Sequence, residues 1–195
     1  MAYFDDRSLF VDQPDIEKTM TSDATNLNNK AVAMECFIPY FKNKSVIEFG
    51  CADGRFCSWF LDKGAVVTHG VDIKDTYIDQ AKLNMANYFT DDKYSFEVGD
   101  ITLDAFNPSK SYDVVALMNV LNFKLPFKQI EKACQVSRLG TVLVACQEEV
   151  TVNDTGEIYK IDQIKDKFIN LNYANITDLH KDGDNRMYFA AEMKV

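Results

Sequence analysis

The fold of this chain is decided by one stretch, Ser45-Val46-Ile47-Glu48-Phe49-Gly50-Cys51-Ala52-Asp53-Gly54-Arg55. It begins as a short apolar run, passes through a turn of small residues, and leads into Arg55–Lys63, which has the apolar spacing of a helix. A strand, a glycine-containing turn and a helix in this order are typical of α/β folds that bring their backbone close to a nucleotide-like ligand.

Apolar runs and helical patterns alternate along the rest of the chain. Strands are expected at Ser45–Phe49, Val66–Val71, Tyr94–Val98, Asp113–Met118 and Thr141–Ala145, with helices at Arg55–Lys63, Thr76–Tyr88, Phe127–Val136 and Ile161–Leu171. Two more strands, Asn175–Leu179 and Met187–Met193, flank a turn-rich tetrad at Asp182–Asn185 and predict an antiparallel hairpin at a sheet edge. Near-continuous apolar strands that alternate with helices predict a doubly wound, mostly parallel sheet covered on both faces.

No repeat or Pro/Gly/Ser-rich linker divides the chain, so we expect one domain over residues 27–195. Residues 1–26 are polar and aromatic by turns and are interpreted as an N-terminal arm or lid. A helix is expected over Leu27–Phe41, weakened near its end by Pro39.

Composition narrows the class of protein. The chain has 195 residues, 47% of them hydrophobic and 26% charged, and a net charge of −9, which disfavours nucleic acid as a partner. No apolar run approaches the ~20 residues of a membrane span. Asp5 and Asp6 argue against a signal peptide, and an odd, scattered set of cysteines without zinc-site spacing favours reduced thiols, no metal and a cytoplasmic location.

Three acidic residues fall at or near the carboxyl ends of successive expected strands: Glu48, Asp72 and Asp100. In an open parallel sheet the ligand lies outside these ends. A single carboxylate there is usually a turn residue or a helix cap. Three on successive strands beside a glycine turn indicate a binding site.

The charge of the turn indicates the kind of ligand. Its pattern is G-x-A-x-G, and Asp53 inside it, with Glu48 before it, would repel the pyrophosphate of a dinucleotide. S-adenosyl-L-methionine instead offers an ammonium, a sulfonium, a ribose and an adenine. Asp72 would accept hydrogen bonds from the ribose hydroxyls and Asp100 from the adenine amine, while Glu48 and the Gly50 region would face the ammonium.

Four segments in order then resemble the motif set of class I S-adenosylmethionine-dependent methyltransferases: Val46–Arg55, Val71–Ile73, Val98–Ile101 and Tyr112–Leu121. The resemblance implies a Rossmann-like, seven-stranded sheet with an antiparallel seventh strand, and S-adenosyl-L-methionine as cofactor. It also implies that the turn residues Gly50, Cys51 and Gly54 bind the cofactor, that Ile73 and Ile101 sandwich the adenine, and that the backbone at Asn119 touches the methionine portion. Ala52 departs from the family, which usually has a glycine there.

A shorter resemblance concerns the tail, Leu179–Lys194, which is similar to the end of small bacterial tellurite-resistance methyltransferases. It implies that His180 and Arg186 face the methyl acceptor and that Arg186 binds an anionic group. From the residues alone, a histidine in such a hairpin loop is most often just solvated. Tellurite is not inferred as the substrate.

The sequence therefore predicts methyl transfer to the O, N or S atom of a small molecule, with the acceptor covered by the N-terminal arm and an irregular loop, Gln147–Lys160. A protein or peptide acceptor, or a non-catalytic protein that binds S-adenosylmethionine, are the alternatives. Asn119–Asn122 stands where enzymes that methylate DNA amino groups carry Asn-Pro-Pro-Tyr, which also disfavours nucleic acid. Nothing in the sequence indicates an oligomeric state.

Overall fold

The computed structural model describes residues 32–108 and 110–194. The expected arm, residues 1–26, and the first part of the helix expected at Leu27–Phe41 lie outside the described residues. From residue 32 on the segment is helical, but it is interrupted by a 3-10 turn, η3 (Glu35–Phe37), before α3 (Ile38–Phe41). Pro39 lies in the first turn of α3, where its missing N–H has no intrahelical partner to lose.

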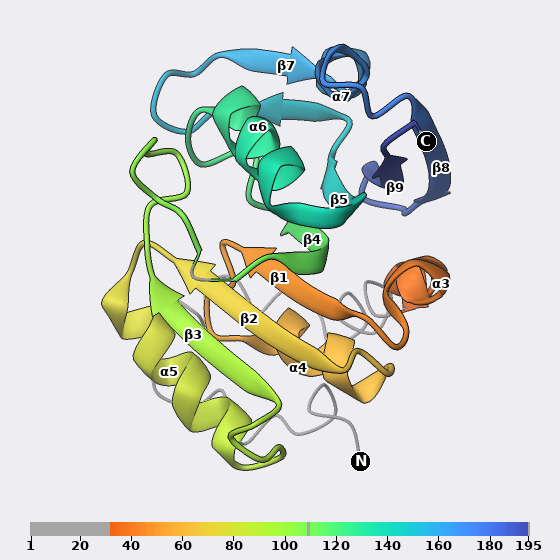
Figure 1. Ribbon diagram of the computed structural model, residues 1–195. Helices are drawn as coiled ribbons and strands as arrows, with labels where there is room; N and C mark the ends of the chain where they lie inside the picture. The colour runs from red at the N-terminus through yellow and green to blue at the C-terminus, as the bar shows by residue number, and fades with distance from the viewer. Residues whose placement is uncertain (1–31, 109, 195) are drawn as a thin grey trace.

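A seven-stranded sheet runs through the molecule in the order β3-β2-β1-β4-β5-β9-β8 (Figure 1). Its strands are β1 (Ser45–Phe49), β2 (Val67–Asp72), β3 (Tyr94–Val98), β4 (Tyr112–Met118), β5 (Ser137–Gln147), β8 (Asn175–Lys181) and β9 (Arg186–Glu192). The first five pair in parallel, whereas β9 is antiparallel to both β5 and β8. The predicted mostly parallel sheet, with its antiparallel seventh strand and edge hairpin, is confirmed.

Helices cover both faces of the sheet, as Figure 1 shows. On one face, α6 (Pro126–Val136) and α7 (Ile161–Asn170) bury their apolar sides against residues of β1, β4 and β5. On the other face, α3 and α4 (Arg55–Asp62) pack against the same strands, and α5 (Asp75–Ala86) packs beside α4. The central strands are buried on both sides, which explains their near-continuous apolar sequence.

The prediction that Gln147–Lys160 is a loop is wrong in part. The segment contains a short antiparallel hairpin of β6 (Glu149–Thr151) and β7 (Ile158–Lys160). Strands of three residues have too little periodicity to be recognised, and these are held by burial of Val150 and Val152. Strand β5 is also longer than expected. Its last residue, Gln147, pairs with Arg186, the first residue of β9, so β5 and β9 stay paired up to the turn between β8 and β9.

Asp113 ties the start of β4 to the start of β1. Its carboxylate accepts hydrogen bonds at 2.9 Å from the backbone N–H and the hydroxyl of Ser45, and it pairs with Arg138. Burial by itself would raise the pKa of Asp113, but the bonds from Ser45 and Arg138 outweigh it and lower the pKa below its ordinary value.

We expect Asp113→Asn to lower the free energy of unfolding at pH 7 by about 1–2 kcal/mol. Because the folded-state pKa is depressed, this stabilisation is present above the unfolded-state pKa of about 3.9 and is lost as the pH falls through the folded-state value. Urea unfolding of both proteins between pH 7 and pH 3 measures the difference, which should shrink below about pH 4. A difference that does not change with pH would contradict this role of the carboxylate.

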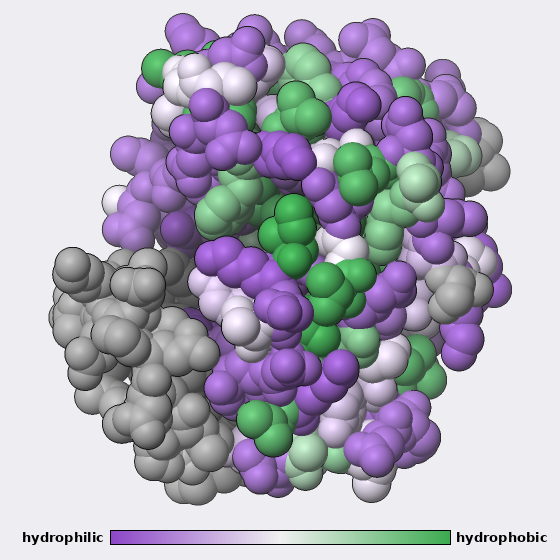
Figure 2. Space-filling view, turned by 90° about the vertical axis from the view of Figure 1, so that its left-hand side faces the viewer, coloured by the Kyte–Doolittle hydropathy of each residue, from purple (hydrophilic) through white to green (hydrophobic). Residues whose placement is uncertain are grey.

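Over the part of the chain that the structure describes, no helix combines the length and apolar character needed to cross a bilayer. The face in Figure 2 is mainly hydrophilic, with small apolar patches near its centre.

Candidate functional site

The carboxyl ends of β1, β2, β3 and β4 meet at one edge of the sheet and bring most of the predicted residues together. Backbone hydrogen bonds fix the loops that leave these ends. The N–H groups of Gly50 and Cys51 both donate to the carbonyl of Val71, at 2.8 and 3.0 Å, and Gly99 donates to the carbonyl of Asp72 at 2.9 Å. The glycine turn, Asp72 and the loop of Asp100 are therefore neighbours, as expected for parallel strands.

The glycine turn has a backbone that side chains would obstruct. Gly50 has φ +73°, and a Cβ there would lie 2.4 Å from a methyl carbon of Val120. Ala52 also has a left-handed φ of 46°, a conformation that is costly for alanine and explains why glycine is usual at this position. The turn thus presents bare backbone at the sheet edge, next to the loop that follows β4.

Asp72 holds the turn in place and remains half-buried at the edge. One carboxylate oxygen accepts the N–H of Ala52 and the other accepts the N–H of Lys74, both at 3.0 Å. Ile73, which follows, is 58% exposed. An anchored carboxylate beside an exposed apolar side chain is suited to a ribose and the base attached to it.

Asp100 has more partners than the sequence predicted. One oxygen accepts both the N–H and the hydroxyl of Thr102, and the other pairs with the ammonium of Lys124 at 2.8 Å. Burial alone would raise its pKa, but the bonds from Lys124 and Thr102 outweigh burial and lower it. Asp100 is therefore ionised and able to accept another donor. Ile101 is buried in the core, unlike Ile73.

Glu48 lies fully buried under the turn instead of at its surface. One oxygen accepts the thiol of Cys57 at 3.1 Å, and the other has no hydrogen-bond partner among the described residues. Burial raises the pKa of Glu48 well above its ordinary value, and Asp53 and Asp72 add to this effect. Cys51 is buried too, and burial raises the pKa of its thiol.

Asp53 does not present an uncompensated negative charge to the ligand, contrary to the prediction from the sequence. Its carboxylate pairs with the guanidinium of Arg55, with contacts of 2.7 and 3.0 Å, so its negative charge is compensated locally. Asp53 is also buried, at 3% exposure, and its carbonyl accepts the side-chain amide of Asn84. Asp53 therefore fixes the entry to α4. Lys124 compensates Asp100 in the same way, and burial favours the neutral form of Glu48, so the repulsion of a phosphate rests mainly on Asp72.

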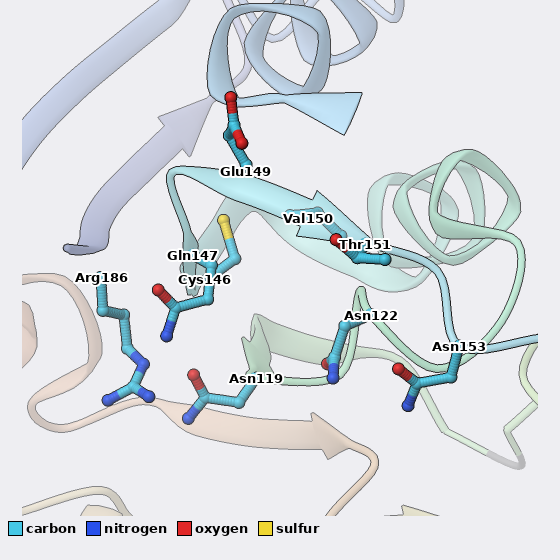
Figure 3. A pocket seen from close by; sticks show the side chains of 9 residues that line it. All are labelled: Asn119, Asn122, Cys146, Gln147, Glu149, Val150, Thr151, Asn153 and Arg186. Carbon is cyan, nitrogen blue, oxygen red and sulfur yellow. The ribbon is translucent and has the colours of Figure 1, made fainter. Parts of the chain in front are cut away.

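A cavity of about 280 Å³ opens next to the turn, between the end of β4, the end of β5 and the β6–β7 hairpin. Most of its lining is polar and neutral. The lining residues are Asn119, Asn122, Cys146, Gln147, Glu149, Val150, Thr151, Asn153 and Arg186. Figure 3 shows the amides of Asn119 and Gln147 near the guanidinium of Arg186, whereas the carboxylate of Glu149 points away from them.

Arg186 is the cation among the described residues that line this cavity. It is 9% exposed, and its Nε and Nη1 donate no hydrogen bond to any residue in the described part of the chain. Nη1 lies 3.5 Å from a carboxylate oxygen of Asp182. A buried guanidinium with donors to spare, facing a polar cavity, is an unsatisfied group that an anion would satisfy.

His180 lies elsewhere than its expected hairpin loop. It is within β8, opposite Tyr188 of β9, and its ring is exposed, 5.8 Å from the ring of Tyr188. It is not among the described residues that line the cavity. A role at the acceptor stays a prediction for both His180 and Arg186, and Arg186 is the one of the two that lines the cavity.

Several residues of the site have no signal in the sequence. Lys124 reaches Asp100 across the loop after β4, and Asn153 of the hairpin donates its backbone N–H to the carbonyl of Asn122 at 2.8 Å. Amide and lysine side chains are common in loops, so these residues can be recognised as part of the site only because the fold brings them together. Within the described residues, no three His, Cys, Asp or Glu side chains gather in a way that could hold a metal ion.

Comparisons with known proteins place this geometry in a family. A family model described as "Methyltransferase domain" matches residues 41–193. No curated protein matches by sequence. Among solved structures, the magnesium protoporphyrin IX methyltransferase of Synechocystis PCC 6803 with bound S-adenosylmethionine has a TM-score of 0.69 and 12% identity, with 96% of this chain and 89% of that chain covered.

Two other similar structures are named for different reactions. The N-methyltransferase NodS of Bradyrhizobium japonicum WM9 has a TM-score of 0.67 and 12% identity, with 90% of this chain and 100% of that chain covered. An O-methyltransferase family protein of Burkholderia thailandensis has a TM-score of 0.67 and 12% identity, with 96% and 66% covered. The fold is common to proteins named for transfer to nitrogen and to oxygen, so it does not identify the accepting atom.

Proposed function

The chain belongs to the methyltransferase domain family and is an S-adenosylmethionine-dependent enzyme, and from this premise we propose that it methylates a small organic molecule that carries an anionic group. The acceptor lies in the cavity of about 280 Å³ beside Asn119, and Arg186 binds its anionic group. The single observation that carries this proposal is the buried guanidinium of Arg186, which faces that cavity with unused donors.

The residues at the sheet edge fit S-adenosylmethionine. Gly50 lets the turn pack against Val120, because a Cβ there would lie 2.4 Å from a methyl carbon of Val120, and its φ of +73° suits the tight turn at the sheet edge. Asp72 would hold the ribose hydroxyls, and Ile73 would cover one face of the adenine. Asp100 would accept a hydrogen bond from the adenine amine. One carboxyl oxygen of Glu48 is buried and has no partner among the described residues, and it would accept a hydrogen bond from the ammonium group.

The bound cofactor would supply an activated methyl group, so the protein has mainly to orient the acceptor. Asn119 directly follows β4 with a left-handed φ of 58° and lines the cavity, so it would lie between the cofactor and the acceptor. The amides of Asn119, Gln147 and Asn122 would hold polar groups of the acceptor. Arg186 would fix its orientation through paired hydrogen bonds to the anionic group.

Among the described residues that line the cavity, none is placed to remove a proton from the acceptor. The one carboxylate among them, Glu149, points away from the amides and Arg186 (Figure 3). The acceptor atom that fits best is therefore one that is nucleophilic without a protein base, such as a thiolate, a carboxylate oxygen or an unprotonated amine.

The test is a screen of methyl transfer with the purified protein, measured as release of S-adenosylhomocysteine. Small carboxylic acids, thiols and amines are compared with the same molecules after their anionic group has been esterified or amidated. We expect turnover with members of the anionic set only. Turnover with a peptide library, and none with small molecules, would overturn the proposal in favour of a protein acceptor.

A further inference from the structure

Asp182 is the centre of a small hydrogen-bond network that includes Arg186. One of its oxygens accepts the N–H groups of Asp184 and Arg186, at 3.0 and 2.9 Å. The other accepts the hydroxyl of Tyr188 at 3.0 Å and lies 3.5 Å from Nη1 of Arg186. The carboxylate is therefore held in place by both chain and side-chain donors, next to one side of the guanidinium.

This arrangement sets the charge immediately around Arg186. The guanidinium and the Asp182 carboxylate are both about nine-tenths buried, so solvent screens them little. Their charges nearly cancel, although the donors of Nε remain available. Nearby, Glu148 pairs with Lys181 at 2.8 Å and adds no net charge. The other polar residues of the cavity that face Arg186 in Figure 3 are amides.

A group with one negative charge suits such a site, and a group with two does not. A monoanion can accept the free donors of Arg186 and hydrogen bonds from the amides. The attraction of a ligand to Arg186 and its repulsion by Asp182 both double when its charge doubles, and they nearly cancel. The cost of taking the ligand out of water grows faster than its charge, so a dianion would need a second cation. Selectivity of this kind comes from a repulsive group built beside an attractive one.

We infer that Asp182 restricts the acceptor to molecules whose anionic group carries a single charge, such as a carboxylate, and excludes dianions such as phosphate monoesters. This inference rests on the proposed function, because it assumes that the anionic group of the acceptor binds Arg186. It adds a specificity-determining residue and a narrower substrate class.

The experiment follows anion binding at Arg186 directly. The Nε–Hε resonance of Arg186 in ¹⁵N-labelled full-length protein, saturated with S-adenosylhomocysteine, is identified by its loss in Arg186→Gln. It is titrated with acetate, methanesulfonate and sulfate at constant ionic strength. Methanesulfonate and sulfate have the same tetrahedral shape but carry one and two charges, so their comparison isolates charge.

In the unmodified protein we expect saturable shifts with acetate and methanesulfonate, and sulfate binding no tighter than methanesulfonate. Asp182→Asn keeps an oxygen for the two backbone donors and removes the charge. It should raise the affinity for sulfate at least tenfold more than that for methanesulfonate. The matched control Asp184→Asn changes an exposed carboxylate of the same turn and should leave both affinities unchanged.

The outcomes separate the two proposals. Tighter sulfate binding in the unmodified protein, or an equal gain for both anions in Asp182→Asn, overturns the role of Asp182 and leaves the anion site at Arg186 intact. No saturable shift with acetate or methanesulfonate overturns that anion site, and the inference about Asp182 fails with it.

Discussion

Asp72→Ala is expected to weaken the binding of S-adenosylhomocysteine by about 1.5–3 kcal/mol, roughly 10- to 150-fold, which is the usual contribution of hydrogen bonds to a charged group. Asp72 is half-buried at the end of β2, and its two oxygens are fixed by the N–H groups of Ala52 and Lys74. A carboxylate held in this way needs no reorganisation to accept the ribose hydroxyls. Calorimetric titration of both proteins gives the two affinities.

Because Asp72 also holds the glycine turn through Ala52, the loss could come from the turn and not from the ribose contact. An analogue without the 2′-hydroxyl distinguishes the two. If Asp72 binds the ribose, the substitution should cost much less affinity for the analogue than for S-adenosylhomocysteine. Asp75→Ala, which removes an exposed carboxylate at the start of α5, is the matched control and should bind normally. Equal losses for both ligands would contradict the ribose contact.

Arg186→Gln is expected to lower kcat/KM for the acceptor by about 2–4 kcal/mol, roughly 30- to 1000-fold, because the anionic group would then be buried without its charged partner. The effect should appear mainly in KM. Affinity for S-adenosylhomocysteine should change less than twofold, since Arg186 lines the cavity and is not one of the residues proposed to hold the cofactor. Steady-state kinetics with the acceptor found in the screen measure the first quantity, and calorimetry measures the second.

The stability of Arg186→Gln adds a second readout. Removal of the guanidinium leaves the buried Asp182 carboxylate without its cation, which is destabilising, but three other donors still bind that carboxylate. We therefore expect the melting temperature to move by only a few degrees. Arg138→Gln, an exposed arginine paired with Asp113 far along the sheet, should leave KM unchanged. A large loss of stability with an unchanged KM would assign Arg186 to structure alone.

The grouping of the acidic strand ends was predictable because it depends on the order of strands. A parallel sheet places the ends of β1, β2 and β3 at one edge, so Glu48, Asp72 and Asp100 had to be neighbours once the strands were recognised. Their burial and partners were not predictable. Asp53 is neutralised by Arg55 two residues away, and Glu48 lies beneath the turn with Cys57. Such contacts depend on side-chain directions that spacing does not specify.

The residues of the candidate acceptor site were predicted from a resemblance, whereas the shape of the cavity is known only from the structure. The β6–β7 hairpin consists of three-residue strands that exist because Val150 and Val152 are buried, and no local pattern distinguishes them from a loop. The resemblance predicted that His180 and Arg186 act together at the acceptor. In the hairpin of β8 and β9, however, His180 is exposed and Arg186 lines the cavity.

The sequence by itself determined the strand–turn–helix start, the parallel sheet with its edge hairpin, and the acidic strand ends that favour S-adenosylmethionine over a dinucleotide. These follow from periodicity, chain order and charge, which are local properties. Only the tertiary structure decided which charges are compensated and which donor is left unused. That outcome depends on contacts between residues far apart in the chain. Examples are the ion pair of Lys124 with Asp100 and the residues of β5 and the β6–β7 hairpin that line the cavity with Arg186.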